Sequence, residues 1–506
     1  MRKWFSFLAL ILALMACNFP TTTVGDPTLN AALSPIEDSG REVASSAPPT
    51  LPPTRDPKLP ILSPTPDAPH GQPTLRSEAG EYVVQPTDIL SAIAERFGVT
   101  LEELIAANQL IDPNQLEVGQ ILLIPPQSPE SLGPAFKILP DSELVNGPYA
   151  IFFDVAAFID SQPGYLKHHQ EEVDQDFLSG AEIVARVATE YSVNPKLLLA
   201  LLELQSGWLS DPNPRTSSLD FPMGKPDVWR SGLYRQLSWA ADNLNKGYYD
   251  WKAGSASGWR TSDGMFIPAS PSINAGTAGV QYLLALLYPE DEWRHLVREN
   301  GFFAMYTQLF GYPFDLAIEP LVPDDLSQPG MQLPFEPGVP WVYSGGPHGG
   351  WGTGSAWSAL DFAPRGDLLG CNESTDWVVA VADGLIVRAE NGAVVQDLDR
   401  DGYEQTGWTV LYMHVSQNQR VQVGETVQAG DRLGHPSCEG GIATATHLHL
   451  ARRYNGEWIP ASGVVPFVMD GWVSISDGVL YDGTLQREGQ SVEACECRDP
   501  EHMLQR

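Results

Sequence analysis

The stretch THLHLARRY, residues 446–454, decides the fold of the C-terminal part of this 506-residue chain. It is a short β-prone run, and on a strand the side chains at positions i and i+2 point to the same face. His447 and His449 therefore face one groove, in a chain that has only ten histidines. The pattern predicts a β domain with two imidazoles at one site.

Similar β-prone runs precede this strand, separated by Gly, Asp and Asn turns. They are WVYSG (341–345), WVVAVADGLIVRAE (377–390), NGAVVQDLD (391–399) and GWTVLYMHV (407–415). We predict an antiparallel β-sheet domain over residues 330–475, after a Pro/Gly-rich joint, and a C-terminal tail, 476–506, with no assignable role. The sequence has no HExxH motif, which excludes a helix-borne zinc site with a glutamate base.

Histidines and one aspartate recur in short motifs of this domain. The motifs are GGPHGGWG with His348, SALDFAP with Asp361, LYMHV with His414, and the His447-Leu448-His449 strand. In this order they resemble the lysostaphin-like zinc endopeptidases over roughly residues 339–460, as do the passages VADGLIV and VQVGETVQAGDRLGH. The commoner members place a histidine four residues before the aspartate, where this chain has Trp357. The thirteen-residue spacing from His348 resembles the beta-lytic metallopeptidase branch instead.

The resemblance implies a role for each of these five residues. His348, Asp361 and His449 would bind one Zn²⁺, leaving a fourth tetrahedral position for water, as a catalytic zinc requires. Zinc can lower the pKa of that water to roughly 7 and polarise a scissile carbonyl. His414 and His447 would orient or deprotonate the water and stabilise the oxyanion. The alternative is a noncatalytic relative in which these residues are structural.

A second acidic motif, residues 397–402, has the alternating carboxylates and glycine of a calcium loop. Asp397, Asp399 and Asp401 would be the Ca²⁺ ligands. Position twelve of the EF-hand count is Trp408 rather than glutamate, so we expect a solvated β-turn.

Residues 140–325 read as a mostly helical domain. Ser179 and Glu182 form a capping box, and Asn194-Pro195 opens a second apolar helix. The segment SVNPKLLLALLELQSGW (192–208) is similar to the catalytic-glutamate helix of lysozyme-like lytic transglycosylases. That family has Glu where this chain has Gln205, and an amide cannot act as the acid. Glu203 lies two residues before Gln205, about 200° away around the helix, and so cannot easily replace the missing glutamate. We therefore expect a noncatalytic lysozyme-like domain, or else an unrelated helical spacer.

Residues 79–126 have the pattern strand, helix, helix, strand, with Asp88 as a helix N-cap and a Thr100–Glu103 capping box. The segment resembles the LysM module, which binds N-acetylglucosamine-containing glycans such as peptidoglycan. The resemblance implies a shallow glycan-binding groove between two loops. The groove residues would be Pro86, Thr87, Asp88, Asn108, Leu110 and Ile111.

The first 17 residues, MRKWFSFLALILALMAC, join a basic start to an apolar stretch too short to span a bilayer stably. This is an export signal. Its end resembles the lipobox of bacterial lipoproteins, with Cys17 as the lipidated residue; the alternative is an ordinary secretory signal. Residues 18–78 are rich in Pro, Ser and Thr, as in APPTLPPTRDP, and should form a flexible linker.

Five cysteines are present, and lipidation of Cys17 leaves an even number in an oxidising compartment. Three pairings are open. We favour Cys371 with Cys438, because both lie in the β domain, although Cys495 and Cys497 could each serve as a partner.

The chain carries 30 basic and 63 acidic residues, a net charge of −33, which disfavours nucleic acid and anionic surfaces as partners. Its membrane contact should be the lipid anchor alone. The sequence thus predicts a multidomain α+β, extracytoplasmic zinc endopeptidase that cleaves peptidoglycan peptides and is targeted by LysM. The alternative is a noncatalytic cell-wall binding or regulatory lipoprotein.

Overall fold

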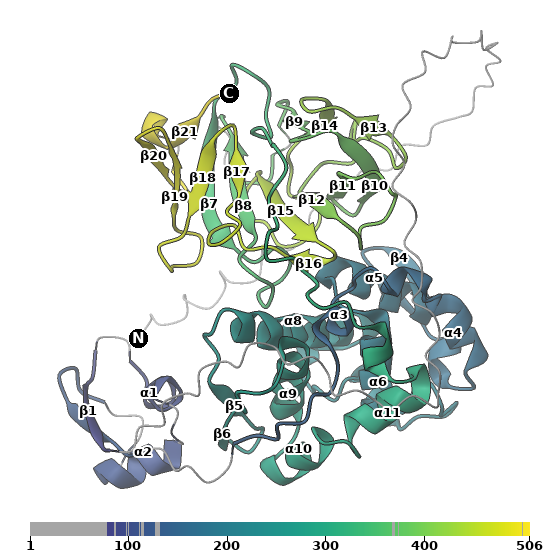
Figure 1. The fold of residues 1–506 in the computed structure, drawn as a ribbon, viewed down its shortest axis with the longest axis vertical. Coiled ribbons are helices and arrows are strands. Elements are labelled where there is room, and N and C mark those ends of the chain that lie inside the picture. Colours follow the sequence, from purple (N-terminus) through teal and green to yellow (C-terminus); the bar gives the residue numbers. More distant parts are fainter. Residues whose placement is uncertain are drawn as a thin grey trace, which may run out of the picture. The chain divides into compact units, whose positions relative to one another are not determined.

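The computed structural model describes residues 78–85, 88–97, 99, 101–110, 112, 116–126, 132–366, 370–372, 374–497 and 499–506. The predicted leader, Cys17, the linker up to residue 77, the predicted cap residue Thr100, and the groove residues Pro86, Thr87 and Ile111 lie outside this part. Within it, the chain mixes helices and sheets as expected (Figure 1). No helix there is long and apolar enough to cross a membrane.

The N-terminal module has the predicted order of strand, helix, helix, strand. Its elements are β1 (Gly80–Val83), α1 (Leu90–Arg96), α2 (Leu101–Asn108) and β2 (Ile121–Ile124). The two strands pair antiparallel, from Gly80 with Ile124 to Val83 with Ile121. Both helices bury apolar side chains against this ribbon, among them Ile93 and Leu104.

The middle region is helical, as predicted. Its helices are α3 (Asp141–Leu144), α4 (Val155–Ser161), α5 (Gly180–Tyr191), α6 (Pro195–Ser206), α7 (Thr216–Asp220), α8 (Leu233–Lys252), α9 (Ala275–Leu287), α10 (Glu290–Leu296) and α11 (Phe302–Phe310). Two hairpins interrupt them, β3 (Gln170–Val173) with β4 (Asp176–Ser179) and β5 (Gly258–Arg260) with β6 (Phe266–Pro268).

The structure confirms the two helix starts that were predicted in the middle region. Ser179 and Glu182 form the complete capping box of α5. Asn194 caps α6 through its side chain, and Pro195 occupies the first turn, where the missing N–H costs nothing. Tertiary burial supplies most of the remaining stability, since α6 is buried from Pro195 to Leu202.

The C-terminal region is an antiparallel β domain. Its main sheet has nine strands in the order β13-β10-β11-β12-β15-β8-β7-β21, with β16 paired to β15. Their bounds are β7 (Trp341–His348), β8 (Ala359–Pro364), β10 (Gly384–Glu390), β11 (Ala393–Asp397), β12 (Trp408–Met413), β13 (Thr426–Val427), β15 (Leu448–Tyr454), β16 (Glu457–Trp458) and β21 (Met503–Leu504).

Smaller sheets complete the domain. One pairs β9 (Val378–Val379) with β14 (Arg432–Gly434); another has β17 (Val468–Met469), β18 (Trp472–Ile475), β19 (Thr484–Arg487) and β20 (Gln490–Glu493). The segment 476–506 is therefore part of the β domain, because β19 pairs with β18 and β21 pairs with β7. The sequence interpretation had treated it as a separate tail, since strands this short carry no readable alternation.

The two faces of the main sheet pack differently. On β12, Val410 and Tyr412 join the core of the β domain, whereas Leu411 and Met413 join the core of the helical region. Strand alternation produces this division, because successive side chains point to opposite faces. One face of the sheet therefore packs into the core of the helical region, and the other face packs into the separate core of the β domain.

Candidate metal and catalytic site

Adjacent strands bring the three predicted ligands together. On β15 and β8, His449 lies directly opposite Asp361. His348 ends the neighbouring strand β7, where the register shifts after Gly345. The irregular end of β7 turns His348 toward the other two side chains.

The three side chains converge closely enough to hold one ion. His348 Nε2 lies 2.9 Å from His449 Nδ1 and 3.2 Å from Asp361 Oδ1, and His449 Nδ1 lies 3.3 Å from the same oxygen. All three ligand atoms fall within 4.8 Å of one another. His348 and Asp361 are buried.

Backbone carbonyls fix the tautomers of both histidines. His348 Nδ1 donates to Gly346 O at 2.8 Å, and His449 Nε2 donates to Gly350 O at 3.0 Å. Each neutral ring therefore turns its remaining lone pair toward the other ring and toward Asp361. A hydrogen bond from the ring nitrogen that does not bind the metal typically orients a metal-ligating histidine in this way.

This arrangement fits a cation. Asp361 Oδ1 is buried and makes no geometrically acceptable hydrogen bond, although buried polar atoms are normally paired. Two lone pairs and one carboxylate oxygen thus converge on one point. Nitrogen and oxygen donors in a set of three suit a catalytic Zn²⁺.

The same electrostatics appear in the pKa values. Burial opposes ionisation of Asp361, but His348 and His449 hold its pKa well below the ordinary value. Burial also opposes protonation of His348, yet the Asp361 charge raises the pKa of that imidazole. The pKa of His449 is lowered, chiefly by burial. A positive charge is therefore favoured beside Asp361.

His414 and His447 lie next to this cluster. Their rings are 4.5 Å apart, and the His414 ring is 6.3 Å from that of His449. His447 Nε2 lies 3.9 Å from Asp361 Oδ2. Each Nδ1 donates to a backbone carbonyl, from His414 to Glu439 at 3.0 Å and from His447 to Ala445 at 2.8 Å. Both Nε2 atoms can then accept a proton.

His414 has an unusual backbone. Its φ of 66° lies in the left-handed region, where a non-glycine residue is strained. Such strain is found where the surroundings hold a side chain in a functional position. Burial, followed by the nearby His447 and His449, lowers the pKa of His414 to about 3.

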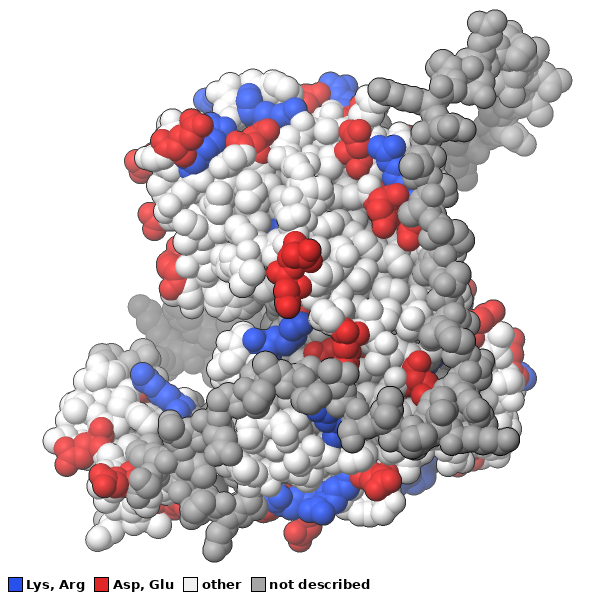
Figure 2. Space-filling view, viewed as in Figure 1, with Lys and Arg blue, Asp and Glu red and all other residues white. Residues whose placement is uncertain are grey.

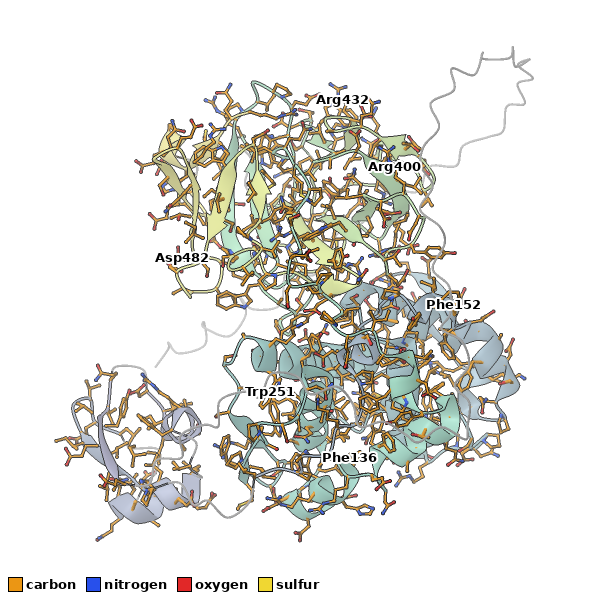
Figure 3. The ribbon with its side chains drawn as sticks, in the orientation of Figure 1. Phe136, Phe152, Trp251, Arg400, Arg432 and Asp482 are labelled. Carbon is orange, nitrogen blue, oxygen red and sulfur yellow. A yellow bond between two sulfur atoms is a disulfide. The ribbon has the colours of Figure 1, made fainter. Side chains whose placement is uncertain are left out.

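Tyr481 is a site residue that the sequence interpretation missed. Its ring stacks on His348 with 4.2 Å between centroids and 21° between planes. Gly346 N donates to Tyr481 O at 2.7 Å, which fixes the loop between β18 and β19 against β7. Figure 3 labels Asp482 on this loop. No local motif marks Tyr481, because 133 residues separate it from His348.

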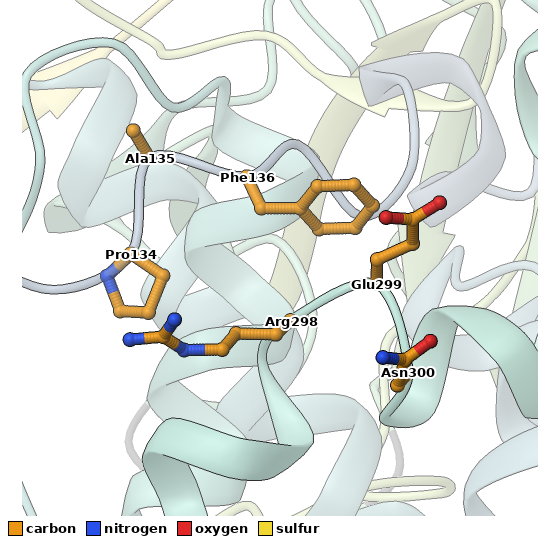
Figure 4. Close-up of a pocket in the computed structure, with 6 residues that line it drawn as sticks. All are labelled: Pro134, Ala135, Phe136, Arg298, Glu299 and Asn300. Carbon is orange, nitrogen blue, oxygen red and sulfur yellow. The ribbon is translucent and has the colours of Figure 1, made fainter.

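Other candidate sites differ from this one. A pocket in the helical region is lined by Pro134, Ala135, Phe136, Arg298, Glu299 and Asn300 (Figure 4), none of which belongs to the metal cluster.

The three predicted calcium ligands, Asp397, Asp399 and Asp401, do come together. Asp397 accepts from the amides of residues 399, 400 and 402, as in the expected turn. Calcium binding there stays untested.

Two of the predicted glycan-binding residues have structural contacts. The Asn108 amide donates to the carbonyls of Leu104 and Leu123 and accepts from Leu123 N, which ties α2 to β2. Asp88 accepts from Gln85 N and the Tyr82 hydroxyl, both at 2.7 Å. Leu110 is half-buried. A glycan-binding role for these residues stays a prediction.

In the helical region, Glu203 accepts from the backbone amides of Leu209 and Ser210. Its carboxylate therefore holds the chain that follows the end of α6. The structure joins Cys371 to Cys438, the favoured pairing, and Cys495 to Cys497.

Comparisons with known proteins match three segments of the chain. Residues 365–460 match the model of peptidase family M23, and residues 82–125 match the LysM domain. Both predicted resemblances are confirmed. Residues 137–321 match the N-terminal domain of LasA, a resemblance that the sequence interpretation did not find. The lysozyme-like interpretation of that region stays a prediction.

Individual relatives agree with these matches. Protease LasA of Pseudomonas aeruginosa, in two strains, is 30% identical over 299 and 300 residues, which are 54% of this chain and 66% of the relative. The chain thus covers slightly less than two thirds of these relatives.

Two solved structures are similar to parts of the chain. One is described as a novel M23 metalloprotease, pseudoalterin, from the deep sea (26% identity, 35% of this chain and 99% of that one, TM-score 0.29). The other is the catalytic domain of the antimicrobial peptidase lysostaphin from Staphylococcus simulans (28%, 24% and 87%, TM-score 0.18).

Proposed function

We propose that this chain, which carries a peptidase family M23 domain behind a LysM domain, is a zinc-dependent endopeptidase that hydrolyses peptide stems or cross-bridges of peptidoglycan. One observation carries the proposal: the lone pairs of His348 Nε2 and His449 Nδ1 converge with Asp361 Oδ1, a buried oxygen that makes no acceptable hydrogen bond. A zinc ion held there would supply Lewis-acid polarisation of the scissile carbonyl.

The chain's own residues move the protons. His414 and His447 each have an Nε2 free to accept, since Nδ1 is committed to a carbonyl. One of them takes a proton from the attacking water as the C–O bond forms. The proton then passes to the leaving nitrogen as the C–N bond breaks, which gives a carboxylic acid and an amine; transfer of the acid proton to the amine leaves a carboxylate and an ammonium group. The ring spacing of 4.5 Å lets both imidazoles reach one substrate.

The LysM domain supports a substrate in the cell wall. A tethered catalytic domain experiences a raised effective concentration of its substrate, so even weak glycan affinity is useful. Lipidation at Cys17 would hold the protein on the extracytoplasmic side of the membrane. Acidic and basic side chains are interspersed on the face in Figure 2, without a continuous basic patch there, in keeping with a partner other than nucleic acid.

The test is digestion of peptidoglycans with different cross-bridges, with and without a chelator, followed by mass analysis of the fragments. We expect new peptide amino termini that disappear with the chelator and return with zinc. Release of sugar fragments that the chelator does not affect would replace this proposal with a glycosidase. Absence of any cleavage, with glycan binding retained, would favour the noncatalytic alternative.

A further inference from the structure

The loop that connects β7 to β8, residues 349–358, is linked to all three predicted metal ligands. It begins directly after His348 and ends before Asp361. Its Gly350 carbonyl accepts from His449 Nε2 at 3.0 Å. The position of this one loop therefore determines how two ligands are joined and how the third is oriented.

The loop has no strand pairing of its own, and a residue of the helical region holds it. Asp242, on α8, accepts from the backbone amides of Thr353 and Gly354, both at 2.8 Å, and from the Thr353 hydroxyl at 2.7 Å. Hydrogen bonds to a charged acceptor are about twice as strong as neutral ones. Asp242 thus satisfies three donors at the turn of the loop.

The packing around these bonds is close. A Cβ added at Gly354 would lie 1.8 Å from the Asp242 carbonyl oxygen, and one at Gly352 would lie 2.3 Å from Asp242 Oδ1. Trp351 packs edge-on against Tyr191 of α5, with 6.4 Å between centroids. The glycines of this loop therefore permit it to lie directly on α8.

We propose that Asp242 is a positioning residue for the metal site, which it serves through the 349–358 loop and the Gly350 carbonyl that orients His449. This inference rests on the proposed zinc site and adds a role for the helical region. The helical region therefore orients a metal ligand of the β domain in addition to packing against one face of its sheet.

The test measures zinc affinity by chelator competition in the purified full chain, for wild type, Asp242→Ala, Asp242→Asn and Asp250→Ala. Loss of partners that orient ligands typically costs 10–100-fold in metal affinity, and we expect about tenfold for Asp242→Ala because it acts through the loop. Asp242→Asn keeps an oxygen for the two amides and should restore most of the affinity. Asp250, also on α8, pairs with Lys246 and should be neutral.

Amide hydrogen exchange and melting temperature distinguish positioning from misfolding. In Asp242→Ala the amides of Thr353 and Gly354 should exchange faster while the melting temperature stays near that of Asp250→Ala. Gly354→Ala, which displaces the loop from α8, should weaken zinc binding in the same way. Wild-type zinc affinity in a folded Asp242→Ala chain would overturn the role of Asp242 alone. Absence of zinc from the wild type would overturn the proposed function as well.

Discussion

Replacing Glu404 by Gln should destabilise the protein strongly and in a pH-dependent way. Glu404 accepts from Arg388 at 2.7 and 3.2 Å and from Arg453 at 2.6 Å. All three side chains are at most 11% exposed. The variant removes the one carboxylate that both buried guanidinium groups contact, and breaking a buried ion pair costs about 3–5 kcal/mol.

The sign of the pH dependence follows from the folded-state pKa. Burial raises the pKa of Glu404, but the charges of Arg388 and Arg453 outweigh burial and lower it below the ordinary 4.5. The unfolded chain therefore takes up a proton first as the pH falls. The stabilisation is fully present above the unfolded pKa and is lost as the pH falls through the folded pKa.

The assay is calorimetric melting of wild type and Glu404→Gln, with the exposed Glu390→Gln as control. At pH 7 the Glu404 variant should melt at least about 6 °C below wild type, at roughly 2 °C per kcal/mol. The difference should shrink as the pH falls below 4.5. A Glu404 variant that melts with the Glu390 control at pH 7 would refute the reasoning.

Two further changes test other parts of the structure. His414→Ala should lower kcat by about 10²–10⁴-fold, as expected for a proton carrier, while zinc content by atomic absorption stays unchanged; loss of zinc would make His414 a ligand instead. Replacing Cys371 and Cys438 together by Ser should cost about 2–5 kcal/mol in unfolding experiments under oxidising conditions, because the bridge spans 67 residues; an unchanged melting temperature would contradict this.

Sequence patterns predicted those strands and helix starts that depend on residues close together in the chain. The alternation in residues 446–454 gave the strand that carries His449, and the Ser179–Glu182 pair gave the start of α5. The resemblance to the beta-lytic metallopeptidase branch implied that His348 and Asp361 act together, and the two side chains lie 3.2 Å apart. Motif order sufficed here because β7, β8 and β15 are neighbours in one sheet.

Contacts between distant segments were not predictable in this way. Tyr481 reaches His348 because the β18–β19 loop returns to the end of β7, where Gly346 N donates to Tyr481 O. The four-residue strands on either side of this loop are too short to show a periodicity. Asp242 reaches the 349–358 loop from a helix more than 100 residues earlier. The contact through which the Asn108 amide ties α2 to β2 was not predicted either, and the glycan-binding role of this residue stays a prediction.

The most direct test of the central claim is the metal content of the purified full chain and of His348→Ala, Asp361→Ala and His449→Ala. The account predicts about one zinc per wild-type chain, as for a single tetrahedral site, and its loss from each variant while the melting profile still shows a folded protein. Wild type without stoichiometric zinc, or three folded variants that all retain it, would contradict the account.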